Sequence, residues 1–316
     1  MERMNTLESA KGLYVVAQTP FDDKGAVDLD SVESLADFYV KHGAAGLTVL
    51  GVAGESVKLT ADEALQVVQR YLKRSQGRPV VVGVSNASIA QLTDLTAKVM
   101  DLGAAGVMIA PPSDLNHEED LFNYFGTVFS QIGNVPVVLQ DFPTSTRVWM
   151  SVPSILRLVE AFPQIQVLKE EDLPSLGKIT ALRQSRGRRI AILTGNNGVY
   201  LPQELERGID GPMSGFSYPE MLSGVYRLHT SGDVEGAHDL FDRYLPLLNY
   251  ENQGQWGVAV RKEVLKRRGA IRHSVMRVPG PRLTPTELAE IDRLVRRVEA
   301  AVAAAGAGAE RDAAGR

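Results

Sequence analysis

The chain contains no cysteine, which excludes disulfide bridges, thiolate metal sites and catalysis by a cysteine nucleophile. Tryptophan occurs only twice, and the five histidines lack the spacing of zinc-binding motifs. We therefore expect no bound metal and no cofactor. Any chemistry must come from amines, carboxylates, amides or hydroxyls.

An excess of charge of one sign is also missing. The 34 basic and 38 acidic residues give a formal net charge of −4, without a long basic block, so nucleic acid is not an expected partner. No apolar run approaches the roughly 20 residues needed to span a bilayer. The first residues lack the apolar stretch of a signal peptide. We expect a cytoplasmic protein that does not contact membranes.

Short β-branched runs alternate with longer amphipathic stretches along most of the chain. This is typical of βα units around a parallel sheet. The runs are almost continuously apolar, which indicates strands buried on both faces, as a closed parallel barrel requires. Eight such runs lie at 13–21, 46–51, 79–85, 106–112, 136–143, 166–171, 190–196 and 211–216. The sequence therefore predicts the α/β class and a (β/α)8 TIM barrel.

Helix signals separate the strands. Gly43, Gly103 and Gly208 each stand shortly before a predicted strand, where a helix-ending glycine is expected. Thr60 and Glu63 have the spacing of a capping box. Apolar residues recur at three- and four-residue spacing, which predicts helices at 28–42, 60–75, 88–102 and 151–162.

The alternation stops after the eighth run, and only helical patterns follow. We expect an N-terminal segment at 1–11, the barrel at 12–218 and a helical subdomain at 219–304. Residues 305–316 are small and polar, so we expect a mobile tail without packed structure.

In such barrels the reactive groups collect at the carboxyl ends of the strands. Lys169 lies near the end of the sixth run, and strand alternation sends Lys169 and Glu171 to the same side. An amine enclosed by apolar strands is desolvated, which favours its neutral form and imine formation with a ketone. Glu171 could then move protons. The alternative is a solvated lysine beside an acidic loop.

Three other strand ends are polar or rich in glycine. Gly51, Val52, Ala53 and Gly54 follow the second run, where backbone N–H groups could bind a carboxylate. The fifth run ends with Gln140 to Phe142, and the seventh ends with Gly195 and Asn196. Each could be an ordinary turn. Their convergence on one barrel mouth argues against an ordinary turn at every one of them and favours a binding site.

With the loop from Gly51 to Glu55 and Lys169 on the sixth strand, the chain resembles the dihydrodipicolinate synthase and N-acetylneuraminate lyase family of class I aldolases. The resemblance covers about residues 12 to 300. It implies a barrel with C-terminal helices, commonly assembled as a tetramer, otherwise as a dimer. It also implies that the GxxGE loop holds the keto-acid carboxylate and that Lys169 forms the Schiff base.

Departures from the family pattern bear on the reaction. Gln140 and Asp141 stand where the synthase and the lyase have Tyr-Asn, and an amide cannot relay protons. Ser145 replaces the arginine of the synthase, which argues against dihydrodipicolinate synthesis. Val52 and Ala53 replace two hydroxyl residues, so their backbone N–H groups must bind the carboxylate.

Other segments are similar to the L-2-keto-3-deoxyarabonate dehydratase branch of the family, including 140–143, 107–112, 244–247 and 259–262. Glu170 stands where the branch has histidine, and we expect it to point away from the lumen. Asn197 stands where the branch has glycine, a change that could alter substrate choice.

The branch implies dehydration of a 2-keto-3-deoxy sugar acid to 2-oxoglutarate semialdehyde, a step of carbohydrate metabolism. Lys169 would form the imine, Glu171 would transfer protons, and Gln140 would orient substrate or water. Asn196 and Ser214 would contact hydroxyls, and Phe142 would shape the pocket. A retro-aldolase releasing pyruvate and a non-catalytic ligand-binding barrel remain as alternatives.

Overall fold

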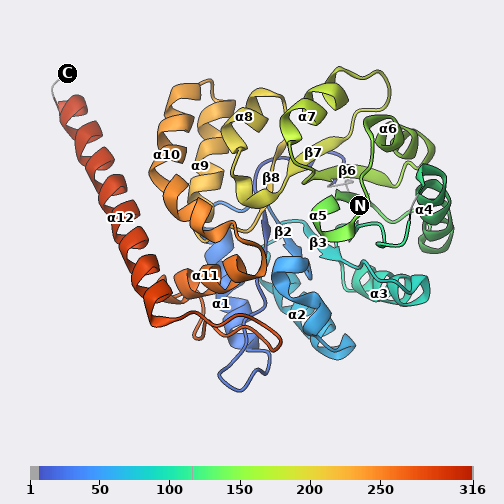
Figure 1. Ribbon diagram of the computed structural model, residues 1–316, viewed down its shortest axis with the longest axis horizontal. Helices are drawn as coiled ribbons and strands as arrows, with labels where there is room; N and C mark the ends of the chain where they lie inside the picture. Colours follow the sequence, from blue (N-terminus) through green and yellow to red (C-terminus); the bar gives the residue numbers. More distant parts are fainter. Residues whose placement is uncertain (1–6, 116, 315–316) are drawn as a thin grey trace.

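Eight parallel strands form a closed barrel in which each strand pairs with its neighbours in sequence and β8 pairs with β1 (Figure 1). The computed structural model describes residues 7–115 and 117–314, with side chains as far as 306. The strands are β1 (Tyr14–Val16), β2 (Gly46–Val49), β3 (Val80–Gly83), β4 (Gly106–Ile109), β5 (Val137–Asp141), β6 (Ile165–Glu170), β7 (Ala191–Thr194) and β8 (Gly211–Ser214). The predicted fold is confirmed.

Helices follow the strands along the chain, and they pack around the barrel. They are α1 (Leu29–Lys41), α2 (Ala61–Arg74), α3 (Ile89–Asp101), α4 (Glu118–Ile132), α5 (Pro143–Thr146), α6 (Val152–Ala161), α7 (Ser175–Gln184), α8 (Leu201–Glu206) and α9 (Pro219–Thr230). Short 3-10 helices η1 (Val52–Gly54), η2 (Ser56–Lys58) and η3 (Asn196–Gly198) follow β2 and β7. The predicted Thr60–Glu63 capping box is present, and Gly43, Gly103 and Gly208 have positive φ as expected.

Strand alternation divides the buried side chains into two layers. Val16, Val81, Met108 and similar residues fill the lumen, whereas their neighbours in sequence pack against the helices. Leu7 is fully buried within the lumen cluster. The chain therefore closes one end of the barrel with its own N-terminal segment.

The C-terminal helices are α10 (Val234–Glu251), α11 (Gly254–Arg267) and α12 (Pro285–Ala314), and α12 runs along α10 at the edge of the molecule (Figure 1). Because α9 packs against both β8 and α10, the boundary expected after residue 218 falls inside the eighth βα unit. The helix also continues through Ala314, past the expected tail boundary at 304, since alanine is the best helix former.

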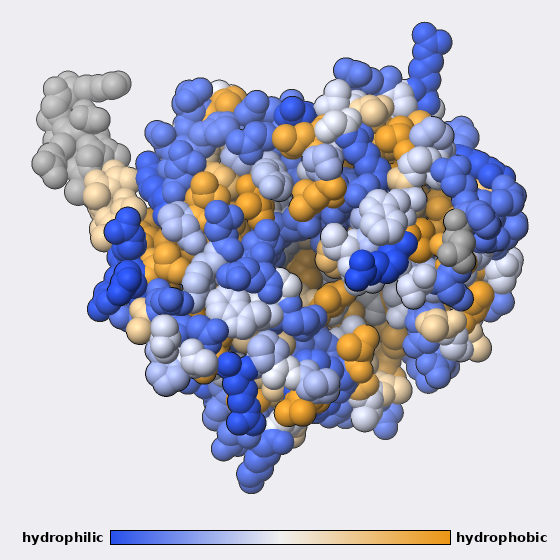
Figure 2. Space-filling model, viewed as in Figure 1, coloured by the Kyte–Doolittle hydropathy of each residue, from blue (hydrophilic) through white to orange (hydrophobic). Residues whose placement is uncertain are grey.

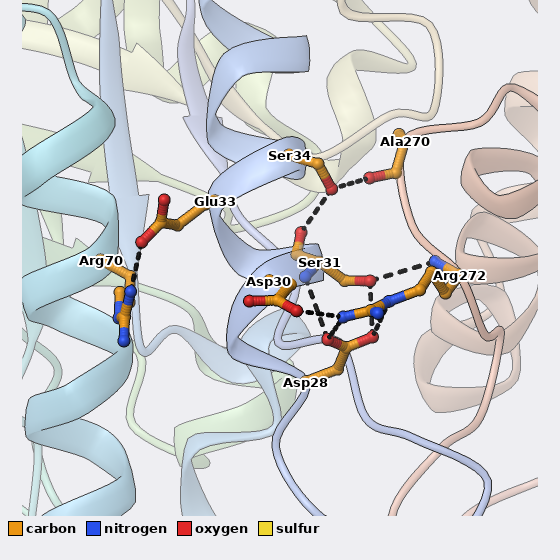
Figure 3. A network of polar contacts seen from close by, with 8 residues as sticks. All are labelled: Asp28, Asp30, Ser31, Glu33, Ser34, Arg70, Ala270 and Arg272. Atoms are coloured by element: carbon orange, nitrogen blue, oxygen red, sulfur yellow. Dashed lines mark hydrogen bonds and ion pairs between the residues drawn. The ribbon is translucent and has the colours of Figure 1, made fainter.

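The α11–α12 segment, residues 268–284, is tied back to the barrel (Figure 3). Arg272 Nη2 lies 2.6 Å from Asp28 Oδ1, and Arg272 Nε donates to Asp28 Oδ2 at 3.0 Å. Ser34 Oγ donates to the carbonyl oxygen of Ala270 at 2.8 Å. These contacts place the segment beside the N-terminal turn of α1.

Within the described part of the chain, no helix combines the length and apolar character needed to cross a membrane.

Candidate active site

Lys169 and Glu171 extend from the end of β6 toward the lumen. Lys169 pairs in register with Gln140 of β5, directly above the lumen pair Val138 and Val167. Its side chain is 5% exposed, and its Nζ lies 3.1 Å from Glu171 Oε2. The amine is therefore enclosed by the barrel, on the side that the sequence predicts.

Gln140 completes a group of three polar side chains. Its Nε2 donates to Glu171 Oε2 at 2.6 Å, so the same carboxylate oxygen contacts both the amide and the lysine. The bonds fix the rotamer of Glu171 inside the buried lumen, where such contacts are stronger than in water. The structure thus brings together the three residues predicted to carry the chemistry.

Gly195 provides the space that Glu171 occupies. A Cβ atom at Gly195 would lie 2.2 Å from Glu171 Oε1 and 2.4 Å from its Cδ, far inside contact distance. Asn196 donates from Nδ2 to the backbone oxygen of Glu171 at 3.2 Å. The end of β7 therefore positions Glu171 through one missing side chain and one hydrogen bond.

The loop after β2 forms the 3-10 turn η1. The Gly54 N–H donates to the Gly51 oxygen at 2.9 Å and is therefore used within the turn. The first N–H groups of such a turn, those of Val52 and Ala53, have no partner inside it. A Cβ at Gly54 would lie 3.1 Å from the Ala17 oxygen, so this glycine allows the loop to approach β1.

A groove of ≈ 1050 Å³ opens at this end of the barrel and is lined by residues that include Gly51, Val52, Gln140 and Phe142. The space-filling view is hollowed near the middle of the face shown, with hydrophobic residues in the depression (Figure 2). Through Gln140 the groove reaches the Lys169–Glu171 pair. The groove therefore has residues of the loop after β2 and the Gln140 side chain in one lining.

Ser214 is not brought to the lumen. It pairs in register with Val15, whose side chain packs against the helices, whereas Met213 is the lumen residue of β8. Parallel neighbours in register face the same side, so the predicted contact between Ser214 and substrate is wrong. Thr48, which sequence reasoning missed, pairs with Val16 and carries its buried hydroxyl on the lumen side.

Behind β6, a buried acidic cluster faces the helix layer. Glu170 points away from the lumen, as expected, and lies beside Asp141 of β5 and Lys178 of α7. Burial and the charge of Asp141 raise the pKa of Glu170 to about 9. Burial works to lower the pKa of Lys178, but the two carboxyl groups outweigh it and raise that pKa.

Asn197 also lies outside the lumen. Its backbone has φ 56°, a left-handed conformation that asparagine tolerates better than most residues. Its Oδ1 accepts from Arg261 Nη2 at 2.6 Å, and its Nδ2 donates to the Glu251 oxygen at 3.2 Å. The side chain that replaces the expected glycine therefore contacts α10 and α11.

Among the described residues, no three histidine or acidic side chains are grouped as a metal site requires.

The closed (β/α)8 barrel thus holds a buried lysine and carboxylate at the carboxyl ends of its strands. Residues 9–301 match the Dihydrodipicolinate synthetase family, and the chain belongs to this family. Members of the family are class I aldolase-type lyases.

Individual relatives carry several names. The chain is 28% identical to L-2-keto-3-deoxyarabonate dehydratase of Azospirillum brasilense over 295 residues, covering 92% of this chain and 94% of that protein. A crystal structure of dihydrodipicolinate synthase from Rhodopseudomonas palustris has 44% identity and a TM-score of 0.90, covering 92% of this chain and 98% of that one. A sialic acid aldolase of Ruminococcus gnavus, at 19% identity and TM-score 0.85 over 94% and 98% of the two chains, shares the fold.

Proposed function

We propose that the protein dehydrates a 2-keto-3-deoxy sugar acid similar to L-2-keto-3-deoxyarabonate, forming 2-oxoglutarate semialdehyde through a Schiff base at Lys169. The observation that carries the proposal is the buried group in which Glu171 contacts both Lys169 and Gln140. The name of the Azospirillum relative, which spans nearly the whole chain, supports the choice of substrate.

The proposed reaction begins when the amine of Lys169 attacks the C2 ketone and water leaves, giving an imine. Glu171 removes a proton from C3, and the electron pair of the C–H bond forms the C2–C3 double bond of an enamine. The enamine expels the C4 hydroxyl, which takes a proton from Glu171 and leaves as water. The unsaturated imine then loses a proton from C5 while C3 gains one, which moves the carbon–carbon double bond to C4–C5 and leaves an enol. The enol takes a proton at C4 and loses the hydroxyl proton to become the aldehyde. Water then hydrolyses the imine and releases the dioxo acid and the free lysine.

Each neighbouring residue has a defined part in this proposal. The Val52 and Ala53 N–H groups bind the C1 carboxylate, and Phe142 bounds the pocket near Gln140. Gln140 holds Glu171 in the orientation that faces the amine. Asn196 has one Nδ2 bond to the Glu171 backbone, and its remaining hydrogen-bonding capacity serves a substrate hydroxyl.

A second candidate is a condensation like that of dihydrodipicolinate synthase, favoured by the 44% identity to the Rhodopseudomonas protein of that name. Against it, Gln140 cannot titrate, and the groove is lined by Ser145 at the position where the synthase has an arginine. A third is a retro-aldol cleavage that releases pyruvate, which shares every step through the imine.

The test is product analysis by mass spectrometry. The protein is incubated with both enantiomers of 2-keto-3-deoxypentonate, with six-carbon keto-deoxy acids, and with the two substrates of dihydrodipicolinate synthase. Loss of one water from a keto-deoxy acid supports dehydration. Release of pyruvate instead supports retro-aldol cleavage, and consumption of the two condensation substrates supports condensation; either result contradicts dehydration.

We also propose that the chain forms a homodimer or homotetramer. Trp149 is 63% exposed and Val57 is 93% exposed, so contact with a second copy of the chain would remove this apolar surface from water. Light scattering coupled to gel filtration measures the mass of the assembly.

A further inference from the structure

Glu55 ends the loop from Gly51 to Glu55, and it is buried although most residues of η1 and η2 around it are not. Of the residues in η1 and η2, only Gly54 is buried, and Val52 is 48% exposed. Glu55 itself is 1% exposed and has a left-handed backbone with φ 54°. Apolar burial alone therefore does not fix the conformation of this loop.

Three donors from three segments converge on the Glu55 carboxylate. Lys262 of α11 contacts Oε1, Lys58 of η2 donates to Oε2 at 2.8 Å, and the Arg277 backbone N–H donates to Oε2 at 3.1 Å. The Lys262 side chain is fully buried. Breaking such a buried pair leaves an uncompensated charge, which is costly.

The Lys262 amine has two further contacts besides Glu55. Its Nζ donates to the Val275 oxygen at 3.0 Å and lies 4.4 Å from the centre of the Phe21 ring. Burial lowers the pKa of Lys262 to about 8, although the Glu55 charge acts in the opposite direction. Unlike Lys169, this amine has no lumen exposure, so a second role in imine formation does not fit its position.

The same helix also contacts the loop through apolar atoms. Ala53 packs against a cluster formed by Val258 and Ala259 of α11 with Met276. Ala259 and Lys262 lie three residues apart and so on neighbouring positions of one helix face. Helix α11 thus sets both the position of Ala53 and the charge that holds Glu55.

We propose that Lys262 is a positioning residue for substrate recognition, acting through Glu55 on the loop whose Val52 and Ala53 N–H groups bind the substrate carboxylate. The inference rests on the proposed function, because it requires a 2-keto acid at that loop. Lys262 touches no substrate atom. Its loss therefore weakens capture of the keto acid while the chemistry at Lys169 continues.

The test compares two variants. Lys262→Met keeps a long side chain but removes the charge, and the control Arg272→Met removes a cation from the α11–α12 segment at its contact with α1 (Figure 3). Borohydride reduction traps the imine with pyruvate, and intact mass gives the pyruvate concentration for half-maximal trapping. Thermal unfolding establishes that each variant is folded.

Lys262→Met is expected to raise the pyruvate concentration for half-maximal trapping about tenfold or more, which corresponds to the loss of one charge-assisted interaction. The amount of imine trapped at saturating pyruvate should stay the same. Arg272→Met is expected to leave the half-maximal concentration within about twofold. If Lys262→Met does not fold, Glu55→Gln tests the same link and should raise the concentration several-fold.

The two possible failures are distinguishable. An unchanged half-saturation in folded Lys262→Met overturns the positioning role, as does an equal rise in Arg272→Met. Absence of trapping in the unsubstituted protein instead removes the proposed function on which the inference rests.

Discussion

Glu171 Oε2 lies 3.1 Å from Lys169 Nζ and 2.6 Å from Gln140 Nε2, so one carboxylate oxygen links the predicted nucleophile to the residue that replaces the family tyrosine. This arrangement allows imine formation and proton transfer to be separated by mutation. Several consequences of the structure can be measured.

Glu171→Gln is expected to form the trapped imine but to lower kcat by about 10²–10⁴-fold, since that is the usual contribution of a positioned general acid or base. Glutamine retains the shape of the side chain and a hydrogen bond to Gln140. Steady-state turnover with the accepted keto-deoxy acid gives the answer. Turnover equal to that of the parent protein would remove Glu171 from the mechanism.

Gly195→Ala is expected to displace the Glu171 carboxyl group, because the new Cβ would lie within 2.5 Å of three Glu171 atoms. We expect a loss of kcat of about 10²-fold by misplacement of the proton-transfer group. Gly177→Ala in α7 is the control, since its Cβ meets nothing within 4 Å. That variant should keep full activity and gain slight stability. Full activity in Gly195→Ala would contradict the assigned position of Glu171.

The cluster behind β6 predicts a pH dependence of stability. Because the folded-state pKa of Glu170 is raised from 4.5 to about 9, first by burial and then by Asp141, the folded protein holds a proton that the unfolded chain releases. This contribution is fully present below about pH 4.5 and is lost as the pH rises toward 9.

Glu170→Gln removes the titrating group but keeps a neutral side chain of the same shape. Its Tm, relative to the parent protein, should therefore be higher at pH 8.5 than at pH 5, by about 3 °C or more. Glu119→Gln, on the exposed surface beside Arg157, should show no such trend. A constant Tm difference across this range would show that Glu170 is ionised in the folded protein.

Asn197 allows a matched pair of substitutions. Asn197→Ala and Asn197→Gly both lose the hydrogen bond to Arg261, at a cost of about 1–3 kcal/mol. Alanine in addition strains the left-handed backbone at φ 56°, by about 1 kcal/mol. Denaturant unfolding should therefore rank the glycine variant above the alanine variant. The reverse order would contradict the conformational argument.

The sequence predicted those parts of the molecule that depend on local pattern. Strand alternation predicts that Lys169, Glu171 and Gln140 lie together, because it points them to the same side as the lumen residues that precede them along β5 and β6. The same reasoning would have excluded Ser214, since Met213 is the inward residue of β8.

Other features depend on contacts that are distant in sequence. The pair of Glu55 and Lys262 joins residues 207 positions apart, and no local pattern matches one to the other. The register shift between β5 and β6 at Val137 and Val138 likewise comes from pairing across the sheet. Such contacts can be identified only from the three-dimensional structure of the closed barrel.

Peptide mapping after borohydride reduction in the presence of pyruvate shows whether the amine of Lys169 forms a Schiff base with a 2-keto acid. We expect one reduced adduct, carried by the peptide that contains Lys169 and absent from Lys169→Ala. An adduct on Lys262 or Lys178 instead, or no adduct at saturating pyruvate as expected of a non-catalytic binding barrel, would contradict a Schiff base at Lys169.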